Sequence, residues 1–375
     1  MTDFSFDNLR RAPDVEAANL FAFDATDRLL LDTAAAAISA DPEGVVVIGD
    51  HYGALTLGAA ALHGARATRT HQDPLSGELA LSANAESAGL SHSFTHHPLG
   101  GDLLAGARVI LLQLPRSLAA LDEMAWTIAH FASPDVTVFA GGRVKHMTTA
   151  MNGVLARHFG TVSAGLARQK SRILTAAAPR VTPTSGFPVG EAHDVGLPDP
   201  LILKAFGTTF GGAKLDAGTR YLLPALAGAR EAGQAVDLGS GNGTIAAYLA
   251  LTRPSLEVLA TDQSASAVAS SRATADANGV GDRIKVVRDD ALSSRASSSA
   301  DLIILNPPFH LEGTVHSGIA LKLFADAGRV LAPGGELWTV WNSHLQYRTP
   351  LTTLVGPTRQ AARNPKFTVT VSTGR

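Results

Sequence analysis

Residues 301–310, DLIILNPPFH, place an apolar run directly before an asparagine, two prolines and an aromatic ring. The side-chain oxygen of Asn306 and the backbone carbonyl of Pro307 are both hydrogen-bond acceptors. Pro308 fixes its own φ and restricts the residue before it to extended geometry, which holds that carbonyl in place. Phe309 adds a ring face for stacking. Two acceptors beside an aromatic face match a planar group that carries an exocyclic NH₂.

A held amine of this kind needs no strong general base. Its nitrogen becomes cationic and acidic once it has attacked a methyl group, so the proton can leave afterwards. Positioning and electrostatics would therefore carry the rate. Stacking on Phe309 is worth about 1 to 3 kcal/mol per base, which orders a ring without selecting its sequence. His310 is more typical of a partly exposed loop residue, and we give it no role.

A second motif, VDLGSGNGTIAAYLA at residues 236–250, is a strand that enters a Gly-x-Gly-x-Gly turn and then a helix. Gly239 and Gly241 allow positive φ and let a ligand touch the backbone, while the helix N-terminus offers unpaired N–H groups. Asp237 lies at the end of the strand before the turn. Nucleotide-binding folds of several kinds share this loop, and a plain tight turn also fits it.

Two further acids follow the next two predicted strands. Asp262, in LATDQS, can accept both hydroxyls of an adenosine ribose, with a helix N-cap as the alternative. Asp290, after IKVVRD, would lie near an adenine amino group, and its neighbour Asp289 competes for that contact. The acids fit NAD as well as S-adenosylmethionine. The Asn-Pro-Pro-Phe stretch favours S-adenosylmethionine, because a methyl sulfonium is the electrophile that a held amine can attack.

A parallel sheet can bring these residues together. Short apolar runs alternate with Ala-rich helical stretches in the second half of the chain, which is the pattern of βα units. The runs are AVDLG, EVLATD, IKVVRD, DLIILN and ELWTVW. Because ligands of α/β sheets bind at the carboxyl ends of the strands, we expect the glycine turn, the acids and Asn306 at one edge.

The first half of the chain repeats this plan with VVVIGD, ALTLGAAALHG, ARVILLQLP and VTVFAGG. An offset of 190 places Gly49 on Gly239 and Gly53 on Gly243. A slightly larger offset places the Gln-Leu-Pro that begins at Gln113 on the Asn-Pro-Pro of the second half. The fold class predicted is therefore α/β, with two tandem Rossmann-like domains.

The first copy lacks the residues that a ligand site needs. In it Val47, His51, Gln72, Gln113 and Arg116 stand for Asp237, Gly241, Asp262, Asn306 and Phe309, respectively. Each replacement removes a polar or permissive residue. We predict that the first domain is degenerate and catalytically dead; a chance likeness between two unrelated α/β domains is the alternative.

A segment rich in Pro, Gly and turn residues, from Ala178 to Pro200, divides the chain. We expect a degenerate domain at 1–177, a linker at 178–200 and a catalytic domain at 201–375. The length of 375 residues also favours two domains.

Composition restricts the function further. The chain has 31 Lys and Arg against 33 Asp and Glu, so no global field favours nucleic acid. It has no cysteine, which excludes disulfides, thiolate nucleophiles and thiolate metal sites. Neither a signal peptide nor a run of about 18 apolar residues occurs, so we expect no membrane span and a cytoplasmic location. No metal site is expected.

Local charge does favour RNA. Residues 136–190 contain no acid and seven positive charges, and the chain after Glu336 contains no acid and five. Such runs can bracket a phosphate backbone, although a solvated surface whose acids lie elsewhere is the alternative. RNA bases are presented for chemistry when they are unstacked or flipped out. We therefore assign the first domain to RNA capture.

The four residues NPPF, with VDLGSGNG ahead of them, resemble the class I S-adenosylmethionine-dependent amino methyltransferases. The likeness extends to FGGAKLDAGTRYLLPAL (210–226), NSHLQY (342–347) and NPKF (364–367), which with the degenerate first domain resemble the bacterial ribosomal RNA guanine-N2 methyltransferases. The segment GGRVKHMT (141–148) is more similar to the large-subunit methyltransferase G type than to the small-subunit methyltransferase C type.

The resemblance implies two tandem class I methyltransferase domains and methyl transfer from S-adenosylmethionine to the N2 amine of a guanine. The partner would be ribosomal RNA or a ribosomal subunit. The residues implied to line the cofactor site are Asp237, Gly239, Gly241, Asp262 and Asp290, and those implied to hold the guanine are Asn306, Pro307, Pro308 and Phe309. Adenine N6, a protein glutamine amide, and a non-catalytic RNA-binding or assembly factor stay open as alternatives.

Overall fold

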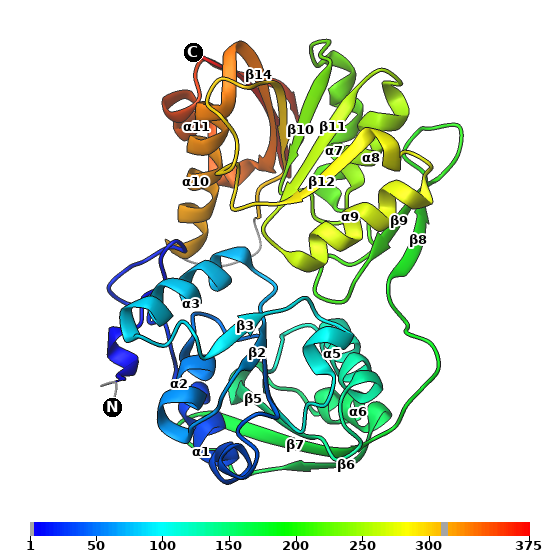
Figure 1. The fold of residues 1–375 in the computed structure, drawn as a ribbon. Helices are drawn as coiled ribbons and strands as arrows, with labels where there is room; N and C mark the ends of the chain where they lie inside the picture. The colour runs from blue at the N-terminus through cyan, green and yellow to red at the C-terminus, as the bar shows by residue number, and fades with distance from the viewer. Residues whose placement is uncertain (1–3, 309–313) are drawn as a thin grey trace. The chain divides into compact units, whose positions relative to one another are not determined.

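The structure, a computed structural model, describes residues 4–308 and 314–375, without the side chains of residues 314–317. It divides into two compact units, Met1–Phe187 and Pro188–Arg375, which Figure 1 draws in successive colours along the chain. Helices and strands alternate in both units, so the predicted α/β fold class is confirmed.

The first unit contains seven strands in one sheet, with helices between them. Its strands are β1 Val45–Ile48, β2 Thr68–His71, β3 Phe94–His96, β4 Val109–Gln113, β5 Thr137–Arg143, β6 Phe159–Ala164 and β7 Ser171–Pro179. Its helices are α1 Ala25–Ala40, α2 Ala54–His63, α3 Leu75–Ala88, α4 Gly101–Leu104, α5 Leu118–Phe131 and α6 Thr149–His158, with 3₁₀ turns η1 Phe6–Asn8 and η2 Val144–His146.

The second unit has a seven-stranded sheet and a separate two-stranded one. Its strands are β8 Val189–His193, β9 Leu201–Ala205, β10 Gln234–Leu238, β11 Glu257–Asp262, β12 Ile284–Arg288, β13 Ala300–Leu305, β14 Leu331–Asn342, β15 Thr358–Arg363 and β16 Phe367–Thr373. Its helices are α7 Ala217–Leu222, α8 Thr244–Thr252, α9 Ala265–Ala277, α10 Thr314–Val330 and α11 Arg348–Leu354, with 3₁₀ turns η3 Leu223–Gly228, η4 Gly281–Arg283 and η5 Ser343–Leu345.

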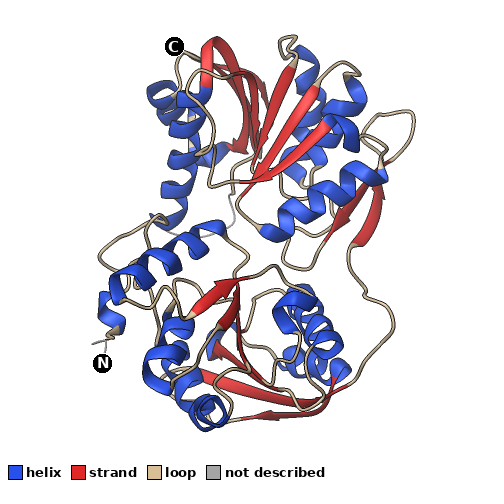
Figure 2. Ribbon diagram, viewed as in Figure 1, coloured by secondary structure: helices blue, strands red, loops and turns tan. Residues whose placement is uncertain are grey.

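The two large sheets have the same strand order. The first runs β3-β2-β1-β4-β5-β7-β6 and the second β12-β11-β10-β13-β14-β16-β15. In each, five parallel strands are followed by two antiparallel ones. Helices flank the strands of each sheet (Figure 2). The tandem repeat predicted from the glycine offset is therefore present as a repeated topology.

Central strands of both sheets are apolar because they are covered on both faces. In β13, Ile303 and Leu305 enter one core cluster, whereas Leu302 and Ile304 enter the other. In β1, alternate residues likewise divide between two clusters. The carboxyl ends of the strands are left as the edge where polar residues can gather.

The glycines that defined the repeat adopt matching conformations. Gly49 and Gly239 have φ values of 79° and 71°, and Gly53 and Gly243 have 103° and 78°. These left-handed values are accessible to glycine without steric cost. In both units a central strand therefore leaves the sheet through the same kind of turn before its helix begins.

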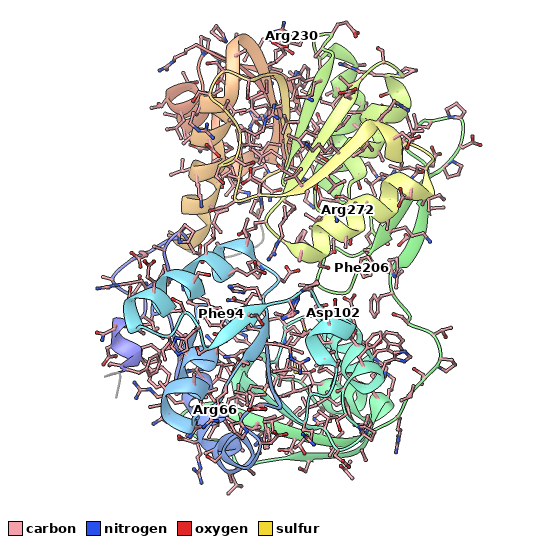
Figure 3. All side chains as sticks on the ribbon, viewed as in Figure 1. Arg66, Phe94, Asp102, Phe206, Arg230 and Arg272 are labelled. Carbon is pink, nitrogen blue, oxygen red and sulfur yellow. The ribbon has the colours of Figure 1, made fainter. Side chains whose placement is uncertain are left out.

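Strand β9 is hydrogen-bonded on one edge by β8 and on the other by side chains of α9. Alternate backbone N–H groups donate to side chains spaced four residues apart, each at 2.9 Å. Ile202 donates to Asn278, the C-cap of α9, Lys204 to Thr274, and Phe206, directly after β9, to Ser270. Two residues of a strand and four of a helix both advance about 6 to 7 Å, so the two series stay in register. Figure 3 labels Phe206 and, on α9, Arg272.

The range 178–200, predicted as a linker, includes regular structure. Residues 189–193 form β8, which pairs antiparallel with β9. The strand has no apolar alternation because four of its five residues are exposed and only His193 is buried. Its sequence therefore carried no strand signal.

Candidate active site

The glycine turn lies between β10 and α8, as the sequence predicts. Gly239, Gly241 and Gly243 all have positive φ. A Cβ at Gly239 or Gly241 would meet no atom within 4 Å, whereas one at Gly243 would lie 2.8 Å from the Cα of Ser271. Gly243 therefore permits α8 to approach α9, and the other two glycines leave backbone that a ligand can approach closely.

Asp237 is fully buried near the end of β10. Its Oδ2 accepts a hydrogen bond from the backbone N–H of Ala246 at 3.0 Å, which fastens the first turn of α8 to the strand. Its Oδ1 has no hydrogen-bond partner among the described residues. Burial raises the pKa of Asp237 to about 7 against the lowering effect of the Ala246 N–H, and the charge of Asp262 adds to the rise. A cationic group at Oδ1 would stabilise the ionised form.

Asp262 is the last residue of β11 and is partly exposed. Its Oδ2 accepts the backbone N–H of Gly241 at 3.0 Å, and its Oδ1 accepts that of Ser264 at 2.9 Å. The N-cap of α9 is Ser264, so Asp262 is not the cap of that helix. The two bonds fix the carboxylate beside the glycine turn.

The two acids after β12 have different surroundings. Asp289 is buried, and its carboxylate accepts the hydroxyl of Ser293 at 2.6 Å and both the N–H and the hydroxyl of Ser294. It therefore closes its own turn. Asp290 is paired instead with Nζ of Lys322 on α10, at 2.5 Å. Both carboxylates are engaged by the chain itself, and Asp290 stays the candidate for an adenine contact because it is partly exposed whereas Asp289 is buried.

Asn306 follows β13 and is held from one side. Its Nδ2 donates to Oδ2 of Asp216 at 2.9 Å and to Oγ1 of Thr219 at 2.8 Å. Its Oδ1 is buried and has no hydrogen-bond partner in the described parts of the chain. An ideal Cβ on Gly218 would lie 3.7 Å from that oxygen, so the glycine leaves room beside it. The carboxamide thus presents an acceptor with unmet hydrogen-bonding capacity.

The two prolines that follow differ in exposure. Pro307 is buried and Pro308 is exposed. Phe309, predicted to supply the stacking face, lies outside the described residues, as does His310. The predicted site residues whose structure is described converge, as expected, on the carboxyl edge of β10, β11, β12 and β13.

Residues 206–216 connect β9 to α7 and join the two parts of this site. Nδ2 of Asn242, in the glycine turn, donates to the carbonyls of Gly212 and Lys214 at 2.9 and 3.2 Å. At the other end, Asp216 is the N-cap of α7 and contacts Asn306. Sequence reasoning gave Asp216 and Thr219 no role. An Asp directly before a helical stretch is an N-cap signal that marks the helix start, although it does not reveal the contact with Asn306.

The first unit fills the corresponding edge with its own side chains. Gln72, in place of Asp262, donates from Nε2 to the backbone carbonyls of Asp50 and His51 at 2.9 and 3.2 Å. The direction of these hydrogen bonds is the reverse of that in the second unit, where Asp262 accepts N–H groups from its loop. A carboxamide amine turned into the loop cannot accept ribose hydroxyls as a carboxylate does.

Asp50 fastens the start of α2, as Asp237 fastens that of α8. Its Oδ2 accepts the N–H and the hydroxyl of Thr56 at 2.8 and 2.7 Å, and its Oδ1 accepts the N–H of Gly53 at 3.1 Å. Val47 occupies the strand position of Asp237. The acid of the first unit therefore lies in the turn and not in the strand, and both of its oxygens are engaged by the chain itself.

Basic residues of the first acid-free run gather at the carboxyl edge of the first sheet. The N–H of Val144, in η2, donates to the carbonyl of Lys170 at the tip of the β6–β7 hairpin at 2.9 Å. Slight desolvation lowers the pKa of the exposed His146, and the positive charges of Arg116, Lys145 and Arg143 lower it further. Four exposed residues of this run, together with the exposed Arg116 from outside it, form what we call the basic cluster: Arg116, Lys145, His146, Arg168 and Lys170.

Other members of that run are paired with acids from elsewhere. Arg157 lies 2.9 Å from Oδ1 of Asp122, and Arg143 lies 3.7 Å from Oδ2 of Asp24. An acid-free run in the sequence is therefore not an acid-free surface. In the C-terminal run, the guanidinium of Arg359 lies over the ring of Trp338, 6.0 Å from its centroid.

Metal-binding clusters and membrane-spanning helices are absent from the described residues. Within residues 4–308 and 314–375, His, Cys, Asp and Glu side chains form no group of three or more that could hold a metal ion. In the same part of the chain, no helix has the length and apolar character needed to cross a membrane.

The second unit combines a seven-stranded sheet of this order with a glycine turn, an acid after the neighbouring strand and Asn-Pro-Pro after the fourth. This combination defines a class I S-adenosylmethionine-dependent methyltransferase. The family model described as "Methyltransferase small domain" matches residues 201–371, and that described as "RLMG N-terminal domain" matches residues 1–180.

Curated relatives are similar over nearly the whole chain. Ribosomal RNA large subunit methyltransferase G of Pseudomonas paraeruginosa is 36% identical over 371 residues, which are 98% of this chain and 97% of the relative. The protein of the same name from Streptomyces avermitilis is 34% identical over 371 residues, covering 96% and 95%. The chain belongs to the family of the ribosomal RNA large subunit methyltransferase G proteins.

A solved structure has the same two-unit fold. It is the T. thermophilus 16S rRNA N2 G1207 methyltransferase in complex with AdoMet and guanosine. Its TM-score is 0.74 at 20% identity, over 94% of this chain and 92% of that one. At this identity the likeness shows the fold alone.

The cofactor of this class, S-adenosylmethionine, fits the residues present. Gly239 and Gly241 offer open backbone, and the buried Oδ1 of Asp237 lacks a partner in the described residues. The enzyme therefore uses S-adenosylmethionine as its methyl donor.

Proposed function

We propose that this enzyme transfers a methyl group from S-adenosylmethionine to the exocyclic N2 amine of a guanine in ribosomal RNA. The observation that carries the proposal is the buried Oδ1 of Asn306, which has no partner among the described residues while its Nδ2 donates twice. A buried acceptor without a donor is costly, so the site is built for a ligand that brings an N–H group.

The chain's residues would hold the amine by its two hydrogens. Oδ1 of Asn306 accepts one, and the backbone carbonyl of Pro307 accepts the other. Phe309 is the proposed stacking face for the guanine ring. Bound S-adenosylmethionine supplies an electrophilic methyl group on its sulfonium. Held by its two hydrogens, the amine would be fixed for attack, and proximity and electrostatics would lower the barrier without a general base; the proton would leave after the nitrogen has become cationic.

The cofactor would be held by the glycine turn and the acids around it. The backbone of Gly239 and Gly241 would lie against the amino acid part. Asp262 would accept the ribose hydroxyls, and Asp290 the adenine amino group. The buried carboxylate of Asp237 would be stabilised in its ionised form by the α-ammonium group.

The first unit would capture the RNA, because its basic cluster lies at the carboxyl edge of its own sheet, the edge that carries the catalytic residues in the second unit. We take large-subunit ribosomal RNA as the substrate, since the relatives bear that name. An assembled ribosomal subunit is the alternative form of the same substrate. Phosphate contacts by Lys and Arg position RNA without selecting its sequence.

The test is methyl transfer from labelled S-adenosylmethionine to four acceptors: undermodified ribosomal RNA, large subunits, small subunits and total protein. Nucleosides from the labelled RNA are then separated by chromatography and identified by mass spectrometry. We expect N2-methylguanosine from the large-subunit RNA. Label in N6-methyladenosine or in protein glutamine would contradict the proposed acceptor, and label only in small-subunit RNA would contradict the proposed substrate.

A further inference from the structure

The carboxamide of Asn306 can point in two ways, and only one leaves an oxygen for the substrate. Both hydrogens of its Nδ2 are engaged, by Oδ2 of Asp216 at 2.9 Å and by Oγ1 of Thr219 at 2.8 Å. A carboxylate accepts hydrogen bonds and does not donate them. Turning the amide round would place its oxygen against the oxygen of Asp216, which is repulsive, so the observed orientation is enforced.

We propose that Asp216 and Thr219 are positioning residues that keep the oxygen of Asn306, and not its NH₂ group, towards the substrate amine. The inference rests on the proposed function, because it takes Asn306 as the residue that holds the amine. A reversed amide would offer a donor to another donor. Neither residue needs to touch the substrate for this purpose.

Asp216 and Thr219 are themselves held rigidly. Asp216 is the N-cap of α7, and its Oδ2 accepts the N–H of Thr219 at 2.8 Å. Thr219 is buried. The segment before Asp216 is tied to the glycine turn, because Asn242 donates to the carbonyl of Lys214. One hydrogen-bonded path therefore runs from the cofactor loop to the residue that holds the acceptor.

A related hydrogen bond between the end of a strand and the start of a helix occurs in the first unit. Gln113, which stands for Asn306, donates from Nε2 to Oδ1 of Asp27. Asp27 is the third residue of α1, as Thr219 is of α7, and the N-cap of α1 is Asp24. Because a catalytically dead copy keeps this tie, it also contributes to folding. A test must therefore separate the orientation of Asn306 from stability.

Asn and Ser variants make this separation at position 216, because Asn, Asp and Ser are similarly good helix N-caps. Asp216→Asn keeps an oxygen that can accept from both Thr219 and Asn306. Asp216→Ser keeps the cap but is too short to reach the carboxamide. We expect Asp216→Asn to retain most of the single-turnover rate of methyl transfer, and Asp216→Ser to lose about ten- to a hundredfold.

The same logic applies at position 219. Thr219→Ser keeps the hydroxyl acceptor, and Thr219→Val keeps the shape without it. We expect the serine variant to be close to wild type and the valine variant to lose about tenfold in rate. Gln113→Ala, which breaks the corresponding tie in the first unit, is the matched control and should change thermal stability without changing the rate.

All variants are measured as full-length protein, with S-adenosylmethionine affinity by calorimetry and unfolding temperature beside the rate. The proposal requires a loss in rate at unchanged cofactor affinity. Equal rates for Asp216→Asn and Asp216→Ser would overturn it, as would losses that follow the unfolding temperature across all variants. The wild-type nucleoside analysis decides the guanine proposal separately, because the Asn and Ser comparison works for any NH₂ acceptor.

Discussion

Asn306 combines an engaged amide nitrogen with a buried oxygen that has no partner in the described residues. Such an oxygen does not stabilise the folded state, and we propose that it holds the substrate amine. We expect Asn306→Ala to lower the methyl transfer rate by about a hundredfold or more, the loss typical of a removed preorganised group. Cofactor affinity should stay close to wild type.

The measurement for Asn306→Ala is single-turnover transfer from labelled S-adenosylmethionine, with calorimetry of cofactor binding as the control. The variant lacks a carboxamide that contacts only Asp216 and Thr219 in the described residues, so the glycine turn is left intact. A variant that methylates at the wild-type rate would remove Asn306 from the mechanism.

Asp237 gives a prediction about pH. Burial raises its pKa from 3.8 to about 7 in the folded chain. Between these two pH values the folded state keeps a proton that the unfolded state has released. The contribution of this proton to the free energy of unfolding is therefore full below about pH 4 and is lost as pH rises to about 7. Asp237→Asn cannot release that proton. The unfolding temperature of Asp237→Asn should therefore fall less than that of the wild type as pH rises through this range.

The comparison is made on cofactor-free protein, across about pH 4 to pH 8. Asp27, whose pKa burial raises to about 8, contributes a decline of the same sign to both proteins. The difference between wild type and Asp237→Asn thus isolates Asp237. Parallel pH profiles would show that the carboxyl of Asp237 titrates normally in the folded state.

At the scale of elements, the glycine turn separates packing from ligand access. Gly243 has a φ of 78° and no room for a Cβ beside Ser271, whereas Gly239 has a φ of 71° with open space. We expect Gly243→Ala to lower the unfolding temperature more than Gly239→Ala, whose backbone strain costs about 1 to 2 kcal/mol. Gly239→Ala should instead weaken cofactor binding, because its methyl group occupies the open side.

Thermal unfolding and calorimetric cofactor affinity of the two glycine variants check this division. Both substitutions add the same methyl group at a left-handed position of the same turn, so each serves as the control for the other. Equal losses of stability, or cofactor affinity that is unaffected in Gly239→Ala, would contradict it.

The elements that could be predicted from sequence are those with a local signature. The glycine turn at Gly239 and the apolar β13 are each encoded by neighbouring residues, and both are present. The repeat that pairs Gly49 with Gly239 is present too, because the same local signature occurs in each half. Strand β8 was missed because its exposed residues lack alternation. The contact of Asn306 with Asp216 was missed because 90 residues separate the two, and no local pattern encodes such a pairing.

Charge was the other limit on prediction. The acid-free run 136–190 correctly marked a basic segment, but it could not show that Asp122 lies against Arg157. Nor could it show that η2 contacts the tip of the β6–β7 hairpin.

At the scale of the whole molecule, the basic cluster predicts how RNA affinity depends on charge. Arg168→Glu with Lys170→Glu should weaken binding of ribosomal RNA and reduce the salt dependence by about one unit of slope for each phosphate that the protein no longer neutralises. Arg172 is left unchanged because it is half-buried in β7. Cofactor affinity should not change, since the cofactor residues belong to the second unit.

The matched control is Arg66→Glu, a charge reversal at an exposed residue just before the amino end of β2, whereas the cluster lies at the carboxyl edge of the sheet; Figure 3 labels Arg66. Filter binding over a series of salt concentrations measures both affinity and slope. If the control weakens RNA binding as much as the double variant does, the loss of affinity comes from net charge, and the basic cluster is not the RNA-binding surface.

The reversed polarity at Gln72 also bears on how the first unit could change in future. Replacing Gln72 by Asp would remove the N–H groups that the carbonyl oxygens of Asp50 and His51 accept and would put a negatively charged acceptor in their place. In the first unit the turn presents carbonyl groups to this position, whereas the turn beside Asp262 presents N–H groups. Presenting N–H groups would require peptide groups of the first turn to rotate, and the acid at position 50 would also have to move into the strand. A single substitution at Gln72 therefore does not recreate the arrangement around Asp262, whose carboxylate accepts backbone N–H groups.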